Sequence, residues 1–286
     1  MITKQELKEV LQKYQFDEKQ IDRILNKKIK TLLQRGNKKN IDAILKILLD
    51  EHDISREAIE ECLSVLVKGK ADEIKEILRV LSNHKISKEA IERCLYVLTG
   101  GKAGEKAKEI DNILDYLLGE QKIPQETIER CLTVLTYGKA DEIKKIFRVL
   151  NDHKISKEAI EGCLTVLGQG KADEIKEIFK ILDKYEISKE AIERCLYILI
   201  GGKARNKAKE IDTILNYLIK EKNISKEAIE ECLYVLAIGK ADEIKKIFRV
   251  LNDRKISKEK IERCLTVLAQ GKADEIEKIF KVLEDY

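Results

Sequence analysis

A sevenfold internal repeat constrains the fold of this chain more than any other feature of its sequence. Each copy opens with a motif close to Ile-Ser-Lys-Glu-Ala-Ile and later contains Gly-Lys, and the copies start at Ile54, Ile86, Ile123, Ile155, Ile187, Ile224 and Ile256. Successive starts lie 32, 37, 32, 32, 37 and 32 residues apart, so the first, fourth and seventh repeats are spaced by 101 residues. Short repeats bury their apolar faces only against their neighbours, so this pattern predicts a solenoid.

The repeat that starts at Ile155 shows the pattern of two helices. Ser156 is a helix-capping residue type, and Ile155 and Ile160 have the spacing of a hydrophobic staple around it. Apolar residues then follow at the i, i+3, i+4 and i+7 spacing of one helix face. Gly170 is expected to end this helix, and a second helix is expected to start near Lys171. We therefore predict an all-α superhelix, an α-solenoid of two-helix repeats of 32 or 37 residues.

Composition agrees with long helices and excludes several other classes of protein. Charged residues make up 38% of the 286 residues, aromatic residues 5%, and Pro124 is the single proline. The formal net charge is only +4, so a nucleic-acid interface depends on where the charges lie. No stretch has the roughly 18 to 20 apolar residues of a membrane helix, and the N-terminus lacks the apolar core of a signal peptide. We expect no membrane association and an intracellular protein of the cytoplasm or nucleoid, with export into a host cell left open.

The two 37-residue repeats are expected to carry about five extra residues at the start of the second helix. The sequence GGKAGEKAKEIDNIL then aligns with GKADEIKEIF. The extra residues bring more positive charge beside the loop, from Lys106, Lys108, Arg205, Lys207 and Lys209. Insertions in repeat arrays often fall on the binding face.

Residues 1–53 are predicted to form an N-terminal cap that contains one divergent repeat, ahead of the seven regular repeats in 54–286. The cap has a basic cluster formed by Lys27, Lys28, Lys30, Arg35, Lys38 and Lys39. Terminal repeats are usually atypical, so this cluster is either a solubilising surface or a non-specific nucleic-acid contact.

The Gly-Lys pair of each repeat has the properties of a phosphate-binding loop. A helix N-terminus offers free backbone N–H groups, glycine permits close approach, and an ammonium group lies alongside. The alternative is a glycine that ends the first helix in a left-handed conformation, with a solvated lysine neutralised by the following Asp-Glu, for example Asp141 and Glu142. The candidate phosphate contacts are Gly69, Lys70, Gly101, Lys102, Gly138, Lys139, Gly170, Lys171, Gly202, Lys203, Gly239, Lys240, Gly271 and Lys272.

The two residues before Gly-Lys vary from copy to copy, whereas the Gly-Lys itself does not. Because phosphate contacts position a protein and base contacts give specificity, a constant anchor beside a variable pair suits modular base recognition. The second residue of each pair is the candidate base contact: Lys68, Gly100, Tyr137, Gln169, Gly201, Ile238 and Gln270.

This arrangement, for example Thr136-Tyr137 before Gly138-Lys139, resembles the transcription-activator-like effectors and their bacterial relatives. Repeats of that family have a similar length, and a variable pair directly precedes a Gly-Lys or Gly-Gly-Lys segment. The resemblance covers roughly residues 54 to 286 and implies loops that face DNA. The Ile-Ser-Lys-Glu-Ala-Ile motif is also similar to the repeats of mitochondrial transcription termination factors, another family that binds nucleic acid.

Two partner classes therefore remain: nucleic acid, with double-stranded DNA favoured over RNA, and a protein or peptide held by an α-solenoid scaffold. The many glutamates, such as Glu158, Glu161, Glu174 and Glu177, favour the protein partner, because a DNA groove should be poor in acids.

Catalysis, cofactors and metals have little support in the sequence. His52, His84 and His153 have no metal-like spacing to cysteine or carboxylate residues, and no nucleotide-binding loop is present. The seven cysteines occupy one slot of the repeat, where we expect small hydrophobic residues on a buried face. We predict no enzyme activity, no cofactor and no metal.

Overall fold

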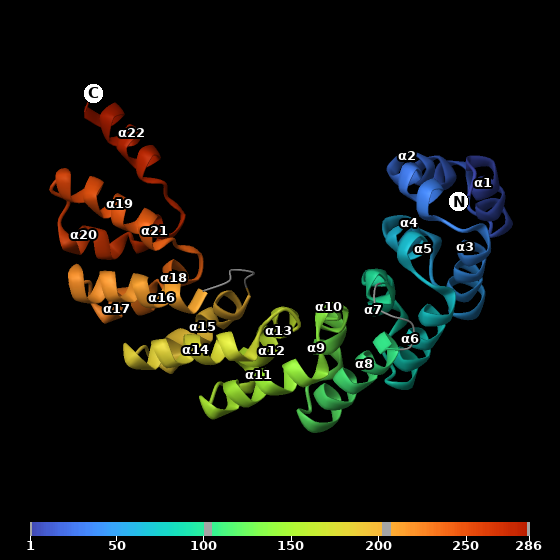
Figure 1. Ribbon diagram of the computed structural model, residues 1–286, viewed down its shortest axis with the longest axis horizontal. Coiled ribbons are helices and arrows are strands. Elements are labelled where there is room, and N and C mark those ends of the chain that lie inside the picture. Colours follow the sequence, from blue (N-terminus) through green and yellow to red (C-terminus); the bar gives the residue numbers. More distant parts are fainter. Residues whose placement is uncertain (1, 100–104, 202–206, 285–286) are drawn as a thin grey trace. The chain divides into compact units, whose positions relative to one another are not determined.

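The computed structural model describes residues 2–99, 105–201 and 207–284, and this part of the chain is all-helical, without a β-strand (Figure 1). Within it, the side chains at positions 27–32, 35, 237, 267, 269, 270 and 284 are not described. The predicted all-α class is confirmed. Contacts divide the chain into unit 1, Met1–Asp141, and unit 2, Glu142–Tyr286, and each unit is described by itself.

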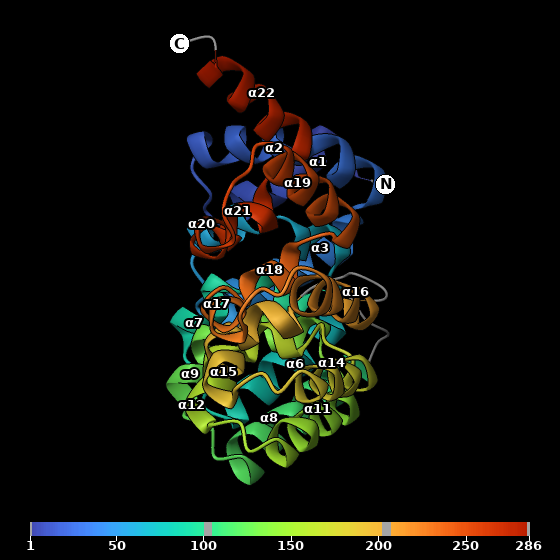
Figure 2. The same cartoon turned by 90° about the vertical axis from the view of Figure 1, so that its left-hand side faces the viewer.

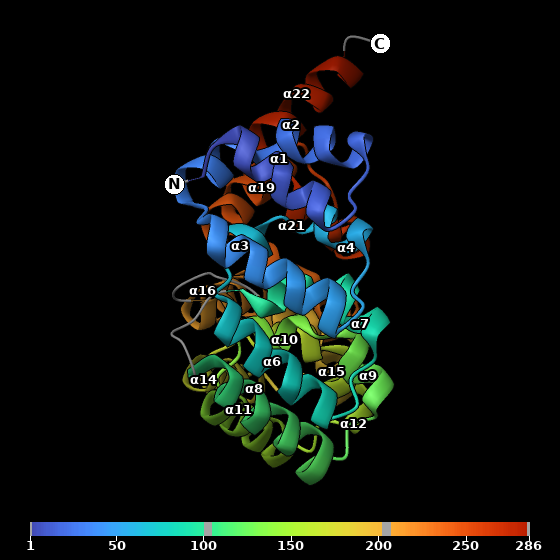
Figure 3. The ribbon, with the colours of Figure 1, turned by 90° about the vertical axis from the view of Figure 1, so that its right-hand side faces the viewer.

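Unit 1 holds a succession of helices that pack in two series. Helices α2, α4, α7 and α9 contact one another in that order, and so do α3, α6 and α8 (Figure 3). Its elements are α1 (Lys4–Lys13), α2 (Glu18–Arg35), α3 (Lys38–Leu45), the π-helix η1 (Lys46–Glu51), α4 (Arg56–Glu61), α5 (Ser64–Lys68), α6 (Ala71–Asn83), α7 (Lys88–Arg93), the 3₁₀-helix η2 (Leu95–Leu98), α8 (Glu105–Leu114), the π-helix η3 (Asp115–Glu120), α9 (Gln125–Arg130) and α10 (Thr133–Tyr137).

Unit 2 repeats this packing. Helices α12, α15, α17 and α20 form one series, and α14, α16, α19 and α22 form the other (Figure 2). Its elements are α11 (Ala140–Asp152), which starts at the boundary, α12 (Lys157–Gly162), α13 (Leu164–Leu167), α14 (Ala172–Lys184), α15 (Lys189–Ile200), α16 (Lys207–Leu215), the π-helix η4 (Asn216–Glu221), α17 (Lys226–Glu231), α18 (Tyr234–Ile238), α19 (Ala241–Asp253), α20 (Lys258–Arg263), α21 (Leu265–Gln270) and α22 (Ala273–Glu284).

The start of most repeats folds as the sequence predicts, although Pro124 and Ser257 make no side-chain cap. The Ser156 side chain accepts the N–H of Ala159 at 3.3 Å, and Ile155 and Ile160 on either side of the cap are buried. The second helices carry the core, and in α6 the side chains of Ile74 and Ile77 are fully buried. Burial of such a side chain stabilises the fold by about 1.5 to 3 kcal/mol.

The first helix of most repeats is interrupted at its cysteine, which the sequence did not predict. Cys62 ends α4 with φ −113° and ψ 56°, and the chain resumes as α5. The interruption lets both Leu63 and Val65 point inward, at 2% and 0% exposure, although residues two apart face different sides of a continuous helix. In the uninterrupted α15 the residue equivalent to Val65, Ile198, is only half-buried.

Six of the seven cysteines lie at this interruption, and Cys195 lies within the continuous α15. Cys163 is buried and Cys264 is exposed, while the other five have intermediate exposure. The expectation of a uniformly buried cysteine face is therefore wrong.

A non-glycine residue lies in the left-handed region after several of the described helix ends, and those ends that lack a π-helix are Schellman motifs. Lys85 has φ 57°, its N–H bonds the Ser82 carbonyl, and the Ile86 N–H bonds the Leu81 carbonyl. The equivalent residues are Gln15, Asp53, Lys122, Lys154, Glu186, Asn223 and Lys255, with φ between 51° and 60°.

One extra residue in three of these helix ends forms a π-helix. At the end of the first long repeat, the Ile123 N–H bonds the carbonyl of Leu117, six residues earlier. At the end of a 32-residue repeat, the Ile86 N–H bonds the carbonyl of Leu81, only five residues earlier. The same wider bond joins Ile224 to Leu218 in the second 37-residue repeat. One of the five extra residues of each long repeat therefore lies at the end of the second helix, which corrects the expectation that all five lie at its start.

Candidate nucleic-acid interface

Packing, not an unusual backbone conformation, requires the glycine before the loop lysine at Gly69 and Gly239. Gly69, Gly138 and Gly239 have φ of −71°, −69° and −66°, with ψ of 150° to 151°. A Cβ atom on Gly69 would lie 2.3 Å from the Val65 carbonyl oxygen and 2.6 Å from Cδ1 of Ile74. The left-handed glycine of the alternative interpretation is therefore wrong, and the close approach of two backbone segments explains why this residue does not vary.

The lysine that follows is exposed at the start of the second helix. Lys70, Lys171 and Lys240 occupy the N-cap position in an extended conformation, and their side chains do not cap the helix. The ammonium groups of Lys70, Lys139 and Lys171 have no hydrogen-bond or ion-pair partner among the described residues. These ammonium groups are therefore accessible to an external anion.

The first N–H of the second helix is already bonded to a side chain of the preceding repeat. Glu142 Oε1 accepts the N–H of Ala172 at 2.6 Å, and Glu243 Oε1 accepts the N–H of Ala273 at 2.7 Å. The same bond joins Asn40 to Ala71, Glu109 to Ala140 and Glu210 to Ala241. A phosphate at this loop would therefore contact the lysine and the remaining free N–H groups of the first turn, not this donor.

In the seventh repeat the glutamate of Gly-Lys-Ala-Asp-Glu pairs with the loop lysine. Glu275 has the same place in its repeat as Glu243, and its Oε1 lies 3.4 Å from Nζ of Lys272. Lys272 is thus the one loop lysine paired with the glutamate three residues later among the described residues. Lys139 and Glu142 do not form such an ion pair, and Glu142 Oε1 instead accepts the N–H of Ala172 in the next repeat.

In five repeats a second glutamate bonds in the opposite direction along the chain. Glu92 Oε1 accepts the N–H of Ser55 at 2.6 Å, and Glu262 Oε1 accepts the N–H of Ser225 at 2.7 Å. The same contact joins Ser87 to Glu129, Ser156 to Glu193 and Ser188 to Glu230. Two glutamate positions of the repeat therefore serve contacts between repeats, whereas Glu177 pairs with Lys180 of its own helix.

The second residue of the variable pair is exposed beside the loop lysine. Tyr137 is 61% exposed and Ile238 is 40% exposed, and Lys68 and Gln169 are exposed as well. Gly201 is half-buried at the end of α15. The described candidate base contacts, apart from Gly201, therefore lie at the surface.

In unit 1 the loops border an open hollow of about 820 Å³. Tyr137 and Lys139 from one repeat line it together with Tyr96 and Lys106 from the preceding repeat and Lys68 from the repeat before that. Burial is the main cause that raises the pKa of Tyr96 to about 12, so this hydroxyl stays protonated near neutral pH. The hollow offers the aromatic faces of Tyr96 and Tyr137 and the exposed ammonium groups of Lys68 and Lys139.

Two lysines of the long repeats point into the protein instead of adding charge to the loop. Lys207 is 6% exposed, its Nζ donates to the Ile198 carbonyl, and burial lowers its pKa. Lys106 Nζ donates to the Thr99 carbonyl at 2.6 Å, and burial also lowers its pKa. The expectation that both thicken an external positive surface is wrong, because each ammonium group binds the carbonyl end of the preceding helix.

Several predicted contacts lie outside the described residues. These are Gly100, Gly101, Lys102, Gly202 and Lys203, the inserted Arg205, and the side chains of Lys27, Lys28, Lys30, Arg35 and Gln270. In the described part of the basic cluster, Lys38 Nζ lies 3.5 Å from Glu9 Oε2, and Lys39 is exposed. Gly170 and Gly271 are half-buried, and Lys240 and Lys272 are exposed.

No helix in the described ranges is both long and apolar enough to cross a membrane. Comparison with known proteins finds no family model, no curated protein and no solved structure that matches this chain.

Proposed function

We propose that this chain is a helical-repeat nucleic-acid-binding protein, with double-stranded DNA as the favoured ligand and RNA as the alternative. We also infer that its two-helix repeats form a solenoid whose Gly-Lys loops contact phosphates. The residue before each Gly-Lys would then contact bases, as the resemblance to transcription-activator-like effectors implies.

One observation carries the proposal. Lys139, Lys171 and Lys240 are exposed, whereas the glutamate three residues after each of them bonds to the next repeat. These loops therefore present cations whose neighbouring glutamates already bond elsewhere. A row of exposed cations is suited to a polyanion, since each lysine that neutralises a phosphate releases a condensed counterion.

The exposed second residue of the pair supports a role in contacting bases. Tyr137 offers an aromatic face, Lys68 a donor, Gln169 a donor and acceptor, and Ile238 an apolar surface. These side chains differ in the bases they favour, which is the property that a modular recognition surface requires.

The test is binding of a random duplex DNA pool across a salt series, with wild type beside the triple variant Lys139→Glu, Lys171→Glu and Lys240→Glu. Each phosphate contact contributes a slope of about 0.9 in log affinity against log salt concentration. The triple variant should therefore flatten the slope by close to 3 and weaken binding at low salt. Single-stranded and duplex RNA pools, measured in parallel, separate RNA from DNA as the ligand.

A matched control makes the same change of net charge at the opposite ends of the second helices. Lys85→Glu, Lys154→Glu and Lys255→Glu alter exposed lysines, and Glu186 already occupies the equivalent position in another repeat. The control should bind like wild type apart from a small loss due to net charge. Absence of binding at low salt, or an equal loss in both triple variants, would contradict the proposal.

A peptide partner is the second candidate, and the hollow in unit 1 favours it. The hollow is lined by Leu135, Tyr96 and Tyr137 as well as by the exposed acid Glu105, which a DNA phosphate would avoid. If the protein does not bind nucleic acid, a peptide library should yield ligands whose binding is lost in Tyr137→Ala. Retention of those ligands by Tyr137→Ala would exclude this hollow as the peptide site.

A further inference from the structure

We propose that His84, Asp111 and Asp115 form a binding site for a divalent transition-metal ion such as Zn²⁺ or Mn²⁺, which clamps two consecutive repeats of unit 1. The site is independent of the proposed nucleic-acid interface. His84 follows the end of α6, Asp111 lies in α8, and Asp115 is the first residue of the π-helix η3.

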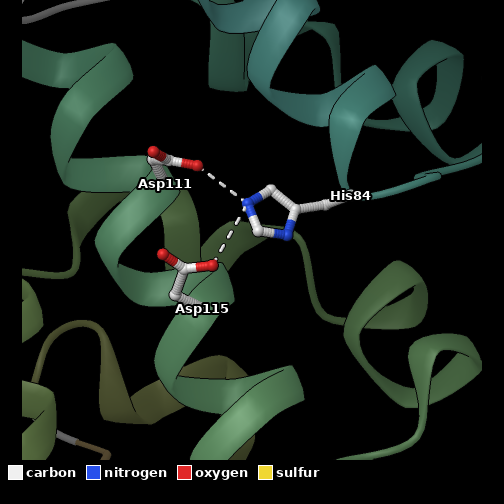
Figure 4. A group of neighbouring side chains, drawn as sticks. All are labelled: His84, Asp111 and Asp115. Carbon is white, nitrogen blue, oxygen red and sulfur yellow. Dashed lines mark hydrogen bonds and ion pairs between the residues drawn. The ribbon is translucent and has the colours of Figure 1, made fainter.

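Two carboxylates converge on a single imidazole nitrogen (Figure 4). His84 Nε2 lies 2.8 Å from Oδ1 of Asp111 and 3.8 Å from Oδ1 of Asp115, and one ligand atom from each residue lies within 4.8 Å of the others. A ring nitrogen carries one hydrogen at most, and the bond to Asp111 uses it. The Asp115 carboxylate therefore cannot accept a hydrogen bond from this nitrogen as well. A cation between the three groups would be attracted by all of them.

The ligand set and its spacing fit a metal ion with mixed nitrogen and oxygen ligands. Bonds of about 2.0 to 2.2 Å to imidazole nitrogen and carboxylate oxygen place tetrahedral ligand atoms about 3.3 Å apart. The present separations of 2.8 and 3.8 Å lie on either side of that value, so small side-chain movements suffice. Imidazole suits zinc and carboxylate suits manganese, and three protein ligands leave a position for water.

The exposures of the three side chains allow an ion to enter. His84 is 14% exposed at its side chain, so its ring is held in place, whereas the Asp111 and Asp115 side chains are 48% and 72% exposed. The π-helix η3, which contains the extra residue, begins at Asp115. Single-turn π-helical insertions of this kind often occur at functional sites.

Equivalent positions elsewhere in the chain lack this set of ligands. In unit 2 the corresponding residues are Tyr185, Asp212 and Asn216, and Lys184 bonds Asp212 at 2.8 Å. In the N-terminal cap the residues are Tyr14, Asp42 and Lys46. Among the three helix pairs that end in a described π-helix, only the pair formed by α6 and α8 with η3 therefore has two carboxylates and an imidazole.

A bound ion would join the C-terminal end of α6 to α8 and η3, which belong to successive repeats. The helices α6 and α8 already pack against each other. The metal would thus fix the packing of one repeat on the next without forming part of the loop surface.

The test is titration of the chelator-treated full-length chain with Zn²⁺ by calorimetry, together with its thermal unfolding. Wild type should bind one equivalent through this site and unfold at a higher temperature in its presence. His84→Tyr and Asp115→Asn introduce residues that the chain itself uses at equivalent positions, so both variants should fold. Each should weaken Zn²⁺ binding by at least about tenfold, whereas the control Asp212→Asn should bind like wild type.

The seven cysteines make thiolate binding the competing explanation, and Co²⁺ distinguishes it. A Co²⁺ complex held by His84 and the two aspartates lacks the intense sulfur-to-metal charge-transfer band of a thiolate complex. Mn²⁺, which disfavours thiolates, provides a second probe through the loss of its free-ion electron paramagnetic resonance signal. A thiolate band in wild type, or Zn²⁺ affinity unchanged in both variants, would overturn the proposal.

Discussion

Glu142 reaches from its own repeat to the next, where its Oε1 accepts the backbone N–H of Ala172 at 2.6 Å. The first backbone N–H groups of a helix have no partner within the helix, and this bond satisfies one of them. The acceptor lies thirty positions earlier in the same chain. Glutamate at this position therefore links repeats, although the sequence alone places it beside the loop lysine.

The linking role of Glu142 predicts that removing the same glutamate costs different amounts of stability at two equivalent positions, Glu142 and Glu275. Glu142→Ala should lower the free energy of unfolding by about 1 kcal/mol, the usual cost of losing a helix cap. Glu142→Gln should retain most of the stability, because its amide oxygen still accepts the bond. Glu275→Ala, in the last repeat, should be nearly neutral. Urea denaturation measures all three, and equal losses in Glu142→Ala and Glu275→Ala would disprove the linking role.

The packing around Gly69 predicts opposite effects of the same substitution at two glycines. Gly69→Ala places a Cβ atom 2.3 Å from the Val65 carbonyl oxygen and should cost about 2 kcal/mol or more in stability. Gly162→Ala meets no atom within 4 Å in the last turn of α12 and should stabilise the chain by up to about 1 kcal/mol. Thermal unfolding of both variants is the measurement, and a tolerated Gly69→Ala would show that the loop glycine is not held by packing.

The left-handed residues at the ends of the second helices predict stabilising substitutions. Lys154 has φ 55°, a conformation that costs a residue with a side chain roughly 1 to 2 kcal/mol. Lys154→Gly should therefore raise stability by about 0.5 to 1 kcal/mol after the entropy cost of glycine. Asn223→Gly should change it less, since asparagine tolerates this region. A loss of stability in Lys154→Gly would show that its side chain contributes more than the relieved backbone strain.

The glutamate that bonds the serine cap predicts a pH dependence. Burial alone would raise the pKa of Glu129, but hydrogen bonds from Gln125 and Ser87 hold that pKa below its usual range. Such a depressed pKa adds stability that is fully present above the unfolded value of about 4.3 and is lost as pH falls through the folded value. The stability difference between wild type and Glu129→Gln should therefore be constant near neutral pH and shrink below about pH 4. A difference that stays constant down to pH 3 would contradict the assignment.

The sequence by itself determined the helical class, the capping serines, the apolar staple and the position of the loop. These features depend on residues close together in the chain, such as Ser156 with Ala159, so local spacing suffices to predict them. The break of the first helix at Cys62 was not predictable in this way, because it depends on which side chains the neighbouring helices bury.

Tertiary structure decided the partners of the charged residues. Sequence spacing places Glu142 beside Lys139, yet in the fold Glu142 bonds the N–H of Ala172. The fold also brings His84 into contact with Asp111, which lies 27 positions later. It also buries Lys207, which the sequence assigned to the surface. The physical reason is that a carboxylate or ammonium group bonds whichever backbone or side-chain group packing brings within about 3 Å, and in a repeat protein that group often belongs to the next repeat.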